Sequence, residues 1–182
     1  TISDCIAHAF NPNLCQGEVS PLKAKSQPQH ASSKTYQSGS FSSTGSGLNS
    51  QEDWVVEGIA MVTDVPITYL GYVNRDTGVI EETGHPLDGR SIEDTVLIYP
   101  KGSGSTVAPY VLMGLIYTDK GPKAIVNRDV CSLTLPACSL LNVPYSHGFE
   151  EDPCIGVNDG DLVKVSKISD EVTIEILKRV DD

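Results

Sequence analysis

The segment that most constrains this chain is a glycine-containing loop at residues 100–110, with the sequence PKGSGSTVAPY. It follows an apolar run typical of a strand and precedes an amphipathic run typical of a helix. Gly102 and Gly104 permit backbone conformations closed to other residues and let a ligand approach the main chain. Because the first turn of a helix has unpaired N–H donors, such a loop attracts anions. We expect Ser105 or Thr106 to cap the helix.

The spacing of this loop is also compatible with a purely structural turn, in which Pro109 is tolerated in the first turn of the helix. The loop lacks the Gly-Lys-Ser/Thr end of a Walker motif and the third glycine of a dinucleotide fingerprint. The pattern by itself therefore leaves the function open.

The remaining patterns of the body predict a strand-rich domain. Residues 106–118 place apolar side chains at helical spacing, which predicts a helix with one face against a sheet. A second short helix is expected over residues 132–141, and residues 158–161 predict a turn, so that the last two strands form a hairpin. Strands are predicted over residues 54–62, 95–99, 123–126, 162–166 and 172–177. Together these elements predict an α/β fold with a layered β/β/α arrangement.

The N-terminal fifty residues differ in composition from the rest of the chain. Residues 20–50 are rich in Ser, Gly, Gln and Lys and have too few apolar side chains to offset the entropy of ordering. We therefore predict a flexible, disordered extension over residues 1–50 and a folded domain over residues 51–182. Residues 1–19 contain some apolar positions that could form a short helix or dock on a partner.

The charge of the chain is unevenly distributed. Of 24 acidic and 13 basic residues, two acids and three lysines lie in residues 1–50, so residues 51–182 carry 22 acids, ten bases and a net charge of −12. Such a body repels nucleic acid and anionic membranes, and we expect neither as a partner. The sequence has no run of 18 apolar residues and no secretory or transit signal, which predicts a cytoplasmic location.

The cysteines and histidines give no metal-binding pattern. Five cysteines form no Cys-x-x-Cys pair, and we expect reduced thiols. The spacing of Cys131 and Cys138 matches no standard metal site, so we predict no metal ligands in this chain. We expect His85 to make a structural hydrogen bond, and residues 147–152, which contain one histidine and three acids, to form a solvated loop.

Three segments of the body follow one another in a recognisable order. Residues 66–80 read PITYLGYVNRDTGVI, residues 85–92 read HPLDGRSI, and the glycine loop with its helix is followed by GPKAIVN at residues 121–127. These segments resemble, in the same order, three motifs of the small swivel domain or small subunit of aconitase X. The motifs are a strand with a G-V-D-x-x-T-G turn, an H-P-x-x-G-x-S-I stretch, and a glycine loop followed by A-P-x-A-I-I. The resemblance covers about residues 55–177 and implies a swivelling β/β/α domain.

The resemblance also implies a chemistry. Aconitase-like enzymes remove a proton beside a carboxylate while a hydroxyl group departs, and in aconitase X the swivel domain supplies a serine as proton acceptor, which matches Ser105. Because an unperturbed serine is a poor base, we expect its alkoxide to be held by backbone N–H groups and by the helix N-terminus. We expect substrate-binding roles for the remaining residues of the loop, namely Lys101, Gly102, Ser103, Gly104 and Thr106.

In this family the metal ligands belong to the large domain. The resemblance therefore implies an iron or iron–sulfur centre in a separate large subunit, no cofactor in this chain, and activity only in the heterodimer. Family substrates include cis-3-hydroxy-L-proline and 5-phosphomevalonate. The continuation TVAPY favours cis-3-hydroxy-L-proline as the small hydroxy-acid substrate, with 5-phosphomevalonate as the alternative.

A function of a different class also remains open. Swivelling β/β/α domains serve as mobile phosphoryl carriers or as non-catalytic binding modules. A carrier of this kind needs a histidine at a glycine-rich helix start, where this chain has Ser105, and none of its four histidines lies in the loop.

Overall fold

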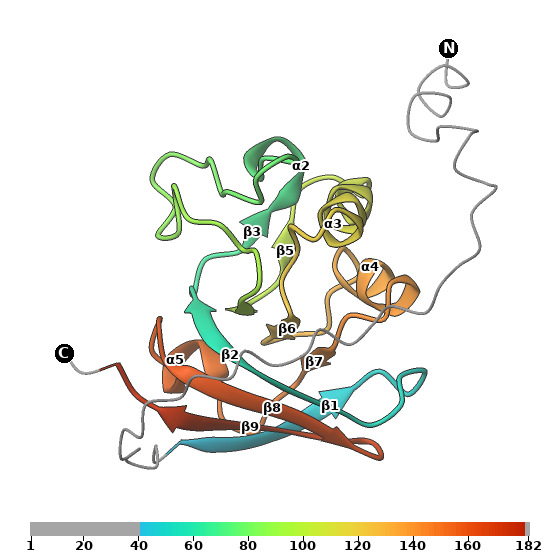
Figure 1. Cartoon of the computed structure of the whole chain (residues 1–182), viewed down its shortest axis with the longest axis vertical. Coiled ribbons are helices and arrows are strands. Elements are labelled where there is room, and N and C mark those ends of the chain that lie inside the picture. Colours follow the sequence, from blue (N-terminus) through green and yellow to red (C-terminus); the bar gives the residue numbers. More distant parts are fainter. Residues whose placement is uncertain (1–40, 181–182) are drawn as a thin grey trace, which may run out of the picture. The chain divides into compact units, whose positions relative to one another are not determined.

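Seven strands close into a barrel in the order β1-β7-β6-β4-β2-β8-β9 in the computed structural model, which describes residues 41–180 (Figure 1). Neighbours among β2, β4, β6 and β7 run parallel, and the other neighbouring pairs are antiparallel. The strands are β1 (Ser42–Gly47), β2 (Trp54–Val62), β4 (Val96–Tyr99), β6 (Ala124–Asn127), β7 (Tyr145–His147), β8 (Leu162–Ile168) and β9 (Glu171–Lys178).

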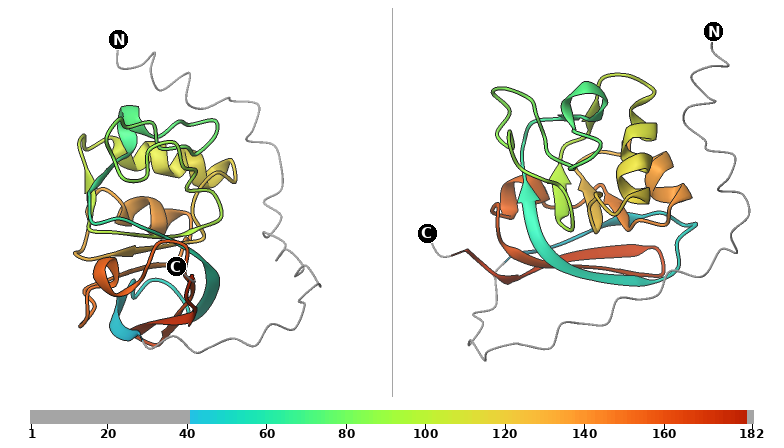
Figure 2. Two further views of the ribbon diagram at one scale, coloured as in Figure 1. Left: turned by 90° about the vertical axis from the view of Figure 1, so that its left-hand side faces the viewer. Right: turned by 45° about the horizontal axis from the view of Figure 1, so that its top comes forward.

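Helices and a small second sheet complete the described unit. The second sheet consists of β3 (Ile67–Thr68) and β5 (Gly102–Ser103), which pair in parallel. The helices are α2 (Tyr69–Tyr72), α3 (Ala108–Tyr117), α4 (Leu135–Leu140) and α5 (Pro153–Gly156). Figures 1 and 2 show α2, α3 and α4 on one side of the barrel, so one face of the parallel strands is covered by helices.

The parallel strands are buried on both faces. In β4 all four residues are buried: Leu97 and Tyr99 belong to the core beneath the helices, whereas Val96 and Ile98 belong to the core inside the barrel. Strand β6 is buried along its whole length in the same way. A strand that is covered on both sides needs a continuous apolar run, which is why the sequence predicts these two strands correctly.

The predicted α/β class and β/β/α layering are confirmed, and most predicted elements lie where the sequence places them. Strand β2 covers the predicted residues 54–62, and helix α3 lies within the predicted residues 106–118. Helix α4 lies within residues 132–141, and β8 and β9 form the predicted hairpin. Gly160, with a φ of 92°, makes the predicted turn before β8.

The predicted extension over residues 1–50 reaches too far into the folded unit, because β1 lies within it. This strand, SSTGSG, has no apolar residue and is held by antiparallel pairing with β9 and β7. A Cβ atom at Gly45 would lie 2.9 Å from the ring of Phe149, and one at Gly47 would lie 2.9 Å from Cγ2 of Val172. The close packing therefore requires glycine at these two positions, and the strand carries no apolar signal in the sequence. Residues 1–40 of the predicted extension lie outside the described residues.

Candidate functional site

The glycine loop leaves the barrel at the end of β4 and reaches α3 through β5 (Figure 1). The pairing of β5 with β3 places Thr68 opposite Ser103, and the hydroxyl oxygens of these two residues lie 2.6 Å apart. Gly104 then turns the chain with a φ of 88°, and a Cβ atom there would lie 2.9 Å from Cγ2 of Thr68. Only glycine fits this turn without strain.

Helix α3 begins at Ala108, and its N-cap is Val107, which provides no capping side chain. The prediction that Ser105 or Thr106 caps the helix is therefore wrong. The chain already turns before the helix: the carbonyl oxygen of Ser105 accepts a hydrogen bond from the N–H of Ala108 at 2.9 Å. Val107 has φ −91° and ψ −1°, unlike the extended backbone of a residue that caps with its hydroxyl. Pro109 lies in the first turn, as predicted.

The loop presents a hydroxyl group and unpaired backbone donors at its surface. Ser105 and Thr106 are exposed, and within residues 41–180 their N–H groups donate to no backbone or side-chain acceptor. The Ser105 Oγ atom accepts a hydrogen bond from the N–H of Val107 at 3.4 Å, so it lies at the positive end of α3. The exposed Lys101 adds a positive charge to the same segment. This arrangement favours a bound oxyanion.

A buried polar chain supports the loop from behind, and it was not foreseen from the sequence. The Sγ atom of Cys131 accepts the N–H of Gly102 at 3.1 Å and lies 3.3 Å from the Thr134 hydroxyl. The chain continues through Tyr99 to Tyr69, with oxygen distances of 3.0 and 2.7 Å. Burial raises the pKa of both tyrosines well above the ordinary value, so these hydroxyls keep their protons. No periodicity links residues so far apart in the sequence.

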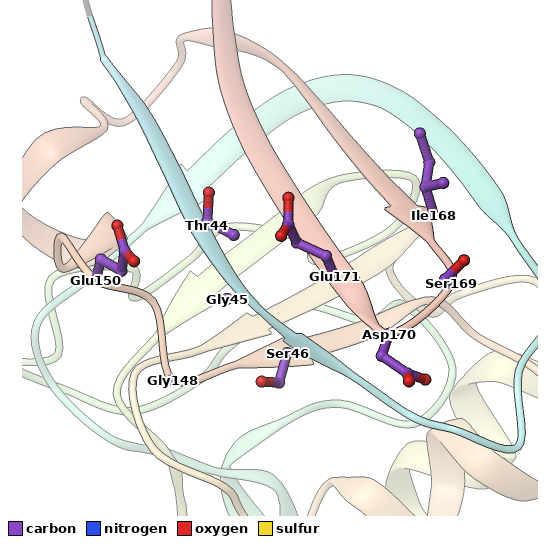
Figure 3. A pocket seen from close by; sticks show the side chains of 9 residues that line it. All are labelled: Thr44, Gly45, Ser46, Gly148, Glu150, Ile168, Ser169, Asp170 and Glu171. Carbon is purple, nitrogen blue, oxygen red and sulfur yellow. The ribbon is translucent and has the colours of Figure 1, made fainter.

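A separate surface pocket of about 770 Å³ lies over β1 and the β8–β9 turn (Figure 3). Its lining residues are Thr44, Gly45, Ser46, Gly148, Glu150, Ile168, Ser169, Asp170 and Glu171. None of them belongs to the glycine loop. Three are acidic, so this pocket repels the carboxylate or phosphate that the glycine loop attracts.

The other candidates have structural roles or lie at the surface. His85 is buried, and its Nδ1 accepts a hydrogen bond from a backbone N–H at 3.1 Å, which confirms the predicted structural role. Glu150 and Glu151 are exposed, but the prediction of a solvated loop is wrong at both ends of this segment. His147 is the last residue of β7, and Asp152 caps α5 and pairs with Arg128. The Asp152 carboxylate is held in place because it accepts hydrogen bonds from both a helix N-terminus and a guanidinium group.

The described cysteines are free thiols, and burial raises the pKa of Cys138 to about 12. Within residues 41–180 no group of three or more His, Cys, Asp and Glu side chains is arranged to hold a metal ion. The same residues contain no helix long and apolar enough to cross a membrane.

Comparisons with known proteins agree with this geometry. The sequence profile of the aconitase X swivel domain matches residues 37–176. The phosphomevalonate dehydratase small subunit of Methanosarcina mazei is 36% identical over 123 residues, which are 68% of this chain and 84% of the relative. The small subunit of the same name from Archaeoglobus fulgidus is 32% identical over 122 residues, 67% of this chain and 90% of the relative.

Two solved structures have the same fold. A crystal structure of Thermococcus kodakaraensis aconitase X in its holo form has a TM-score of 0.64 and 28% identity, over 73% of this chain and 97% of the matched chain. A solution NMR structure of a UPF0107 protein has the same TM-score and identity, over 76% of this chain and all of the matched chain. The chain therefore belongs to the aconitase X swivel domain family.

Proposed function

We propose that this chain is the small subunit of an aconitase X-type dehydratase and that Ser105 is the proton acceptor of the reaction. The chain belongs to the aconitase X swivel domain family, and the observation that carries the proposal is where its Ser105 hydroxyl group lies. It is exposed at the N-terminal end of α3, next to backbone N–H groups that have no acceptor within residues 41–180.

In the proposed reaction, the Ser105 alkoxide takes a proton from the carbon beside the substrate's carboxylate, a carbon–carbon double bond forms, and the hydroxyl group departs as hydroxide. The hydroxide then takes the proton from Ser105 and leaves as water, which restores the alkoxide. A serine acts as a base only where its alkoxide is stabilised. The N–H of Val107 already donates to Ser105 Oγ, and the positive end of α3 favours negative charge at this oxygen. The open N–H groups of Ser105 and Thr106 are free to bind an anionic group of the substrate, and the charge of Lys101 attracts it.

The exposure of this site supports the proposal that a partner closes it. Val107 is 45% exposed and Tyr110 is 71% exposed, and these two large side chains lie at the N-cap and in the first turn of α3, shortly after Ser105 in the chain. A large subunit that covers them would exclude water from Ser105 and strengthen every hydrogen bond to its alkoxide. The iron or iron–sulfur centre that the family resemblance implies would belong to that large subunit.

For the substrate we propose 5-phosphomevalonate. The loop sequence favours cis-3-hydroxy-L-proline and leaves 5-phosphomevalonate as the alternative. Relatives from Methanosarcina mazei and Archaeoglobus fulgidus bear the name phosphomevalonate dehydratase small subunit, which supports this choice over cis-3-hydroxy-L-proline. A phosphorylated hydroxy acid carries two anionic groups, which suits a loop with open N–H donors and an adjacent lysine.

Reconstitution tests the proposal. The full chain, mixed with its large subunit under reducing conditions with iron, is assayed for dehydration of 5-phosphomevalonate and of cis-3-hydroxy-L-proline, and each subunit is also assayed alone. We expect turnover of 5-phosphomevalonate only in the mixture. Ser105→Ala should lower kcat at least ~10²-fold, the scale seen when one preorganised catalytic group is removed.

Ser139→Ala provides the matched control, because Ser139 is an exposed serine on α4. This variant should retain wild-type kcat and bind the large subunit normally. Near-normal turnover by Ser105→Ala would remove Ser105 from the mechanism, and turnover of the hydroxyproline alone would overturn the choice of substrate.

A further inference from the structure

The sulfur atom of Cys131 lies directly behind the glycine loop. Cys131 is only 5% exposed, and its Sγ accepts the N–H of Gly102 at 3.1 Å. Gly102 precedes Ser105 by three residues, and its other side is paired with β3. The contact between the Cys131 sulfur and the Gly102 amide therefore holds β5, which leads into the loop, from its buried side.

The sulfur is in turn held by a chain of hydroxyl groups. Thr134 is fully buried, and its Oγ1 donates to Sγ of Cys131 at 3.3 Å. The threonine has one hydroxyl proton, so Tyr99 must donate to Thr134, and Tyr69 must donate to Tyr99. Every proton of the chain then points toward the sulfur, and the hydrogen bonds reinforce one another.

The space around Gly102 leaves little freedom for this contact. A Cβ atom on Gly102 would lie 3.3 Å from Thr134 Oγ1 and 3.4 Å from Cys131 Sγ. The backbone of Cys131 is anchored separately, because its N–H donates to the hydroxyl of Tyr145 at 3.0 Å. Sulfur, threonine and glycine thus form one packed unit in the core rather than a loose surface contact.

We propose that Cys131 is a positioning residue, whose buried thiol holds the backbone of Gly102 and thereby sets the place of Ser105 at the start of α3. This role rests on the proposed function of Ser105. The hydroxyl chain through Thr134 orients the sulfur, so Thr134 acts in the same unit. Neither residue touches the substrate.

Replacement of Cys131 tests this role. Cys131→Ala removes the acceptor of the Gly102 N–H and leaves a buried donor unpaired, so the loop should shift. In the complex with the large subunit we expect kcat to fall ~10- to 100-fold, because misplacement by about 1 Å is enough for such a loss. KM should rise as well, because the same loop carries the N–H groups proposed to bind the substrate. Thr134→Val should lower kcat in the same direction, and the double variant should lose less than the product of the two single effects.

Cys138→Ala is the matched control. Cys138 is a fully buried cysteine seven residues farther along, in the core beneath the helices, and within residues 41–180 its thiol makes no hydrogen bond to the loop. Its replacement should reduce stability but leave kcat within about twofold of the wild type. A loss of kcat equal to that of Cys131→Ala would show a general packing defect and would overturn the positioning role.

A second readout does not depend on catalysis. In the full chain alone, the ¹H–¹⁵N resonance of the Gly102 amide should shift, and its hydrogen exchange should accelerate, in Cys131→Ala but not in Cys138→Ala. An unchanged Gly102 amide would overturn the proposal. If Ser105→Ala keeps its turnover, the proposed function fails, and the Gly102 amide still decides whether Cys131 holds the loop.

Discussion

At the scale of single residues, two glycines with nearly the same φ angle have different surroundings. Gly104 has a φ of 88° and Gly71 a φ of 90°. A Cβ atom at Gly71 would meet nothing within 4 Å, whereas one at Gly104 would lie 2.9 Å from Cγ2 of Thr68. Because Thr68 also bonds Ser103, the lack of a side chain at Gly104 keeps the loop in register with β3.

This difference predicts unequal effects of alanine. Gly71→Ala should lower the free energy of unfolding by roughly 1–2 kcal/mol, the cost of a left-handed conformation. Gly104→Ala adds a clash and should cost about 1–3 kcal/mol more. Urea unfolding of the full chain measures both values. Equal losses would mean that Thr68 gives way easily and does not constrain the loop.

At the scale of elements, α3 combines two roles. Val111, Leu112 and Leu115 are buried against the sheet, which explains the apolar spacing of the sequence. The opposite side exposes two tyrosines seven residues apart, Tyr110 at the first turn and Tyr117 at the last. Only Tyr110 lies at the N-terminal end of α3, the end that follows Ser105 in the chain. A comparison of the two tyrosines therefore separates the effect of location on the helix from the effect of residue type.

Tyr110→Ala should therefore weaken binding of the large subunit, because an exposed aromatic side chain beside the proposed active site would be covered in the complex. We expect Kd to rise ~10- to 30-fold, or about 1.4 to 2 kcal/mol, which reaches the lower limit of an interface hot spot. Tyr117→Ala, at a residue 74% exposed in the free chain, should leave Kd unchanged. Isothermal titration calorimetry measures both, and equal effects would place the interface elsewhere on the helix.

At the scale of the whole molecule, the two cores contain several groups that ionise only with difficulty. Burial raises the pKa of Cys138 and of Cys154 to about 12, and raises that of Tyr69, Tyr99 and Tyr145 as well. The folded chain keeps these protons at pH values where the unfolded chain releases them. Stability from this source is complete below about pH 9 and is lost as pH rises from there toward the folded-state pKa values.

Unfolding experiments between pH 8 and pH 10.5 check this dependence. The free energy of unfolding should fall with rising pH, by at most about 1.4 kcal/mol per pH unit for each fully buried thiol. Cys138→Ala should lower stability at pH 8 but make the decline with pH less steep, whereas Ser139→Ala should leave the slope unchanged. Parallel curves for wild type and Cys138→Ala would show that this thiol ionises equally easily in both states.

The sequence by itself determined the elements whose signal is local. Strands β4 and β6 are buried on both faces and therefore appear as continuous apolar runs, and α3 appears through its helical spacing. The glycine loop, the position of Ser105 in it and the family resemblance were likewise readable from adjacent residues. These features depend on neighbours in the chain, so a short window of sequence contains them.

Only the tertiary structure decided the features that join distant residues. Strand β1 has no apolar residue and exists because β9 and β7 supply its hydrogen bonds, while packed side chains exclude anything larger than glycine at Gly45 and Gly47. The support of Gly102 by Cys131 spans 29 residues and depends on how β5 and the segment before α4 pack together. Such contacts are set by backbone pairing and by the shape of the core, which leave no pattern in the sequence around either partner.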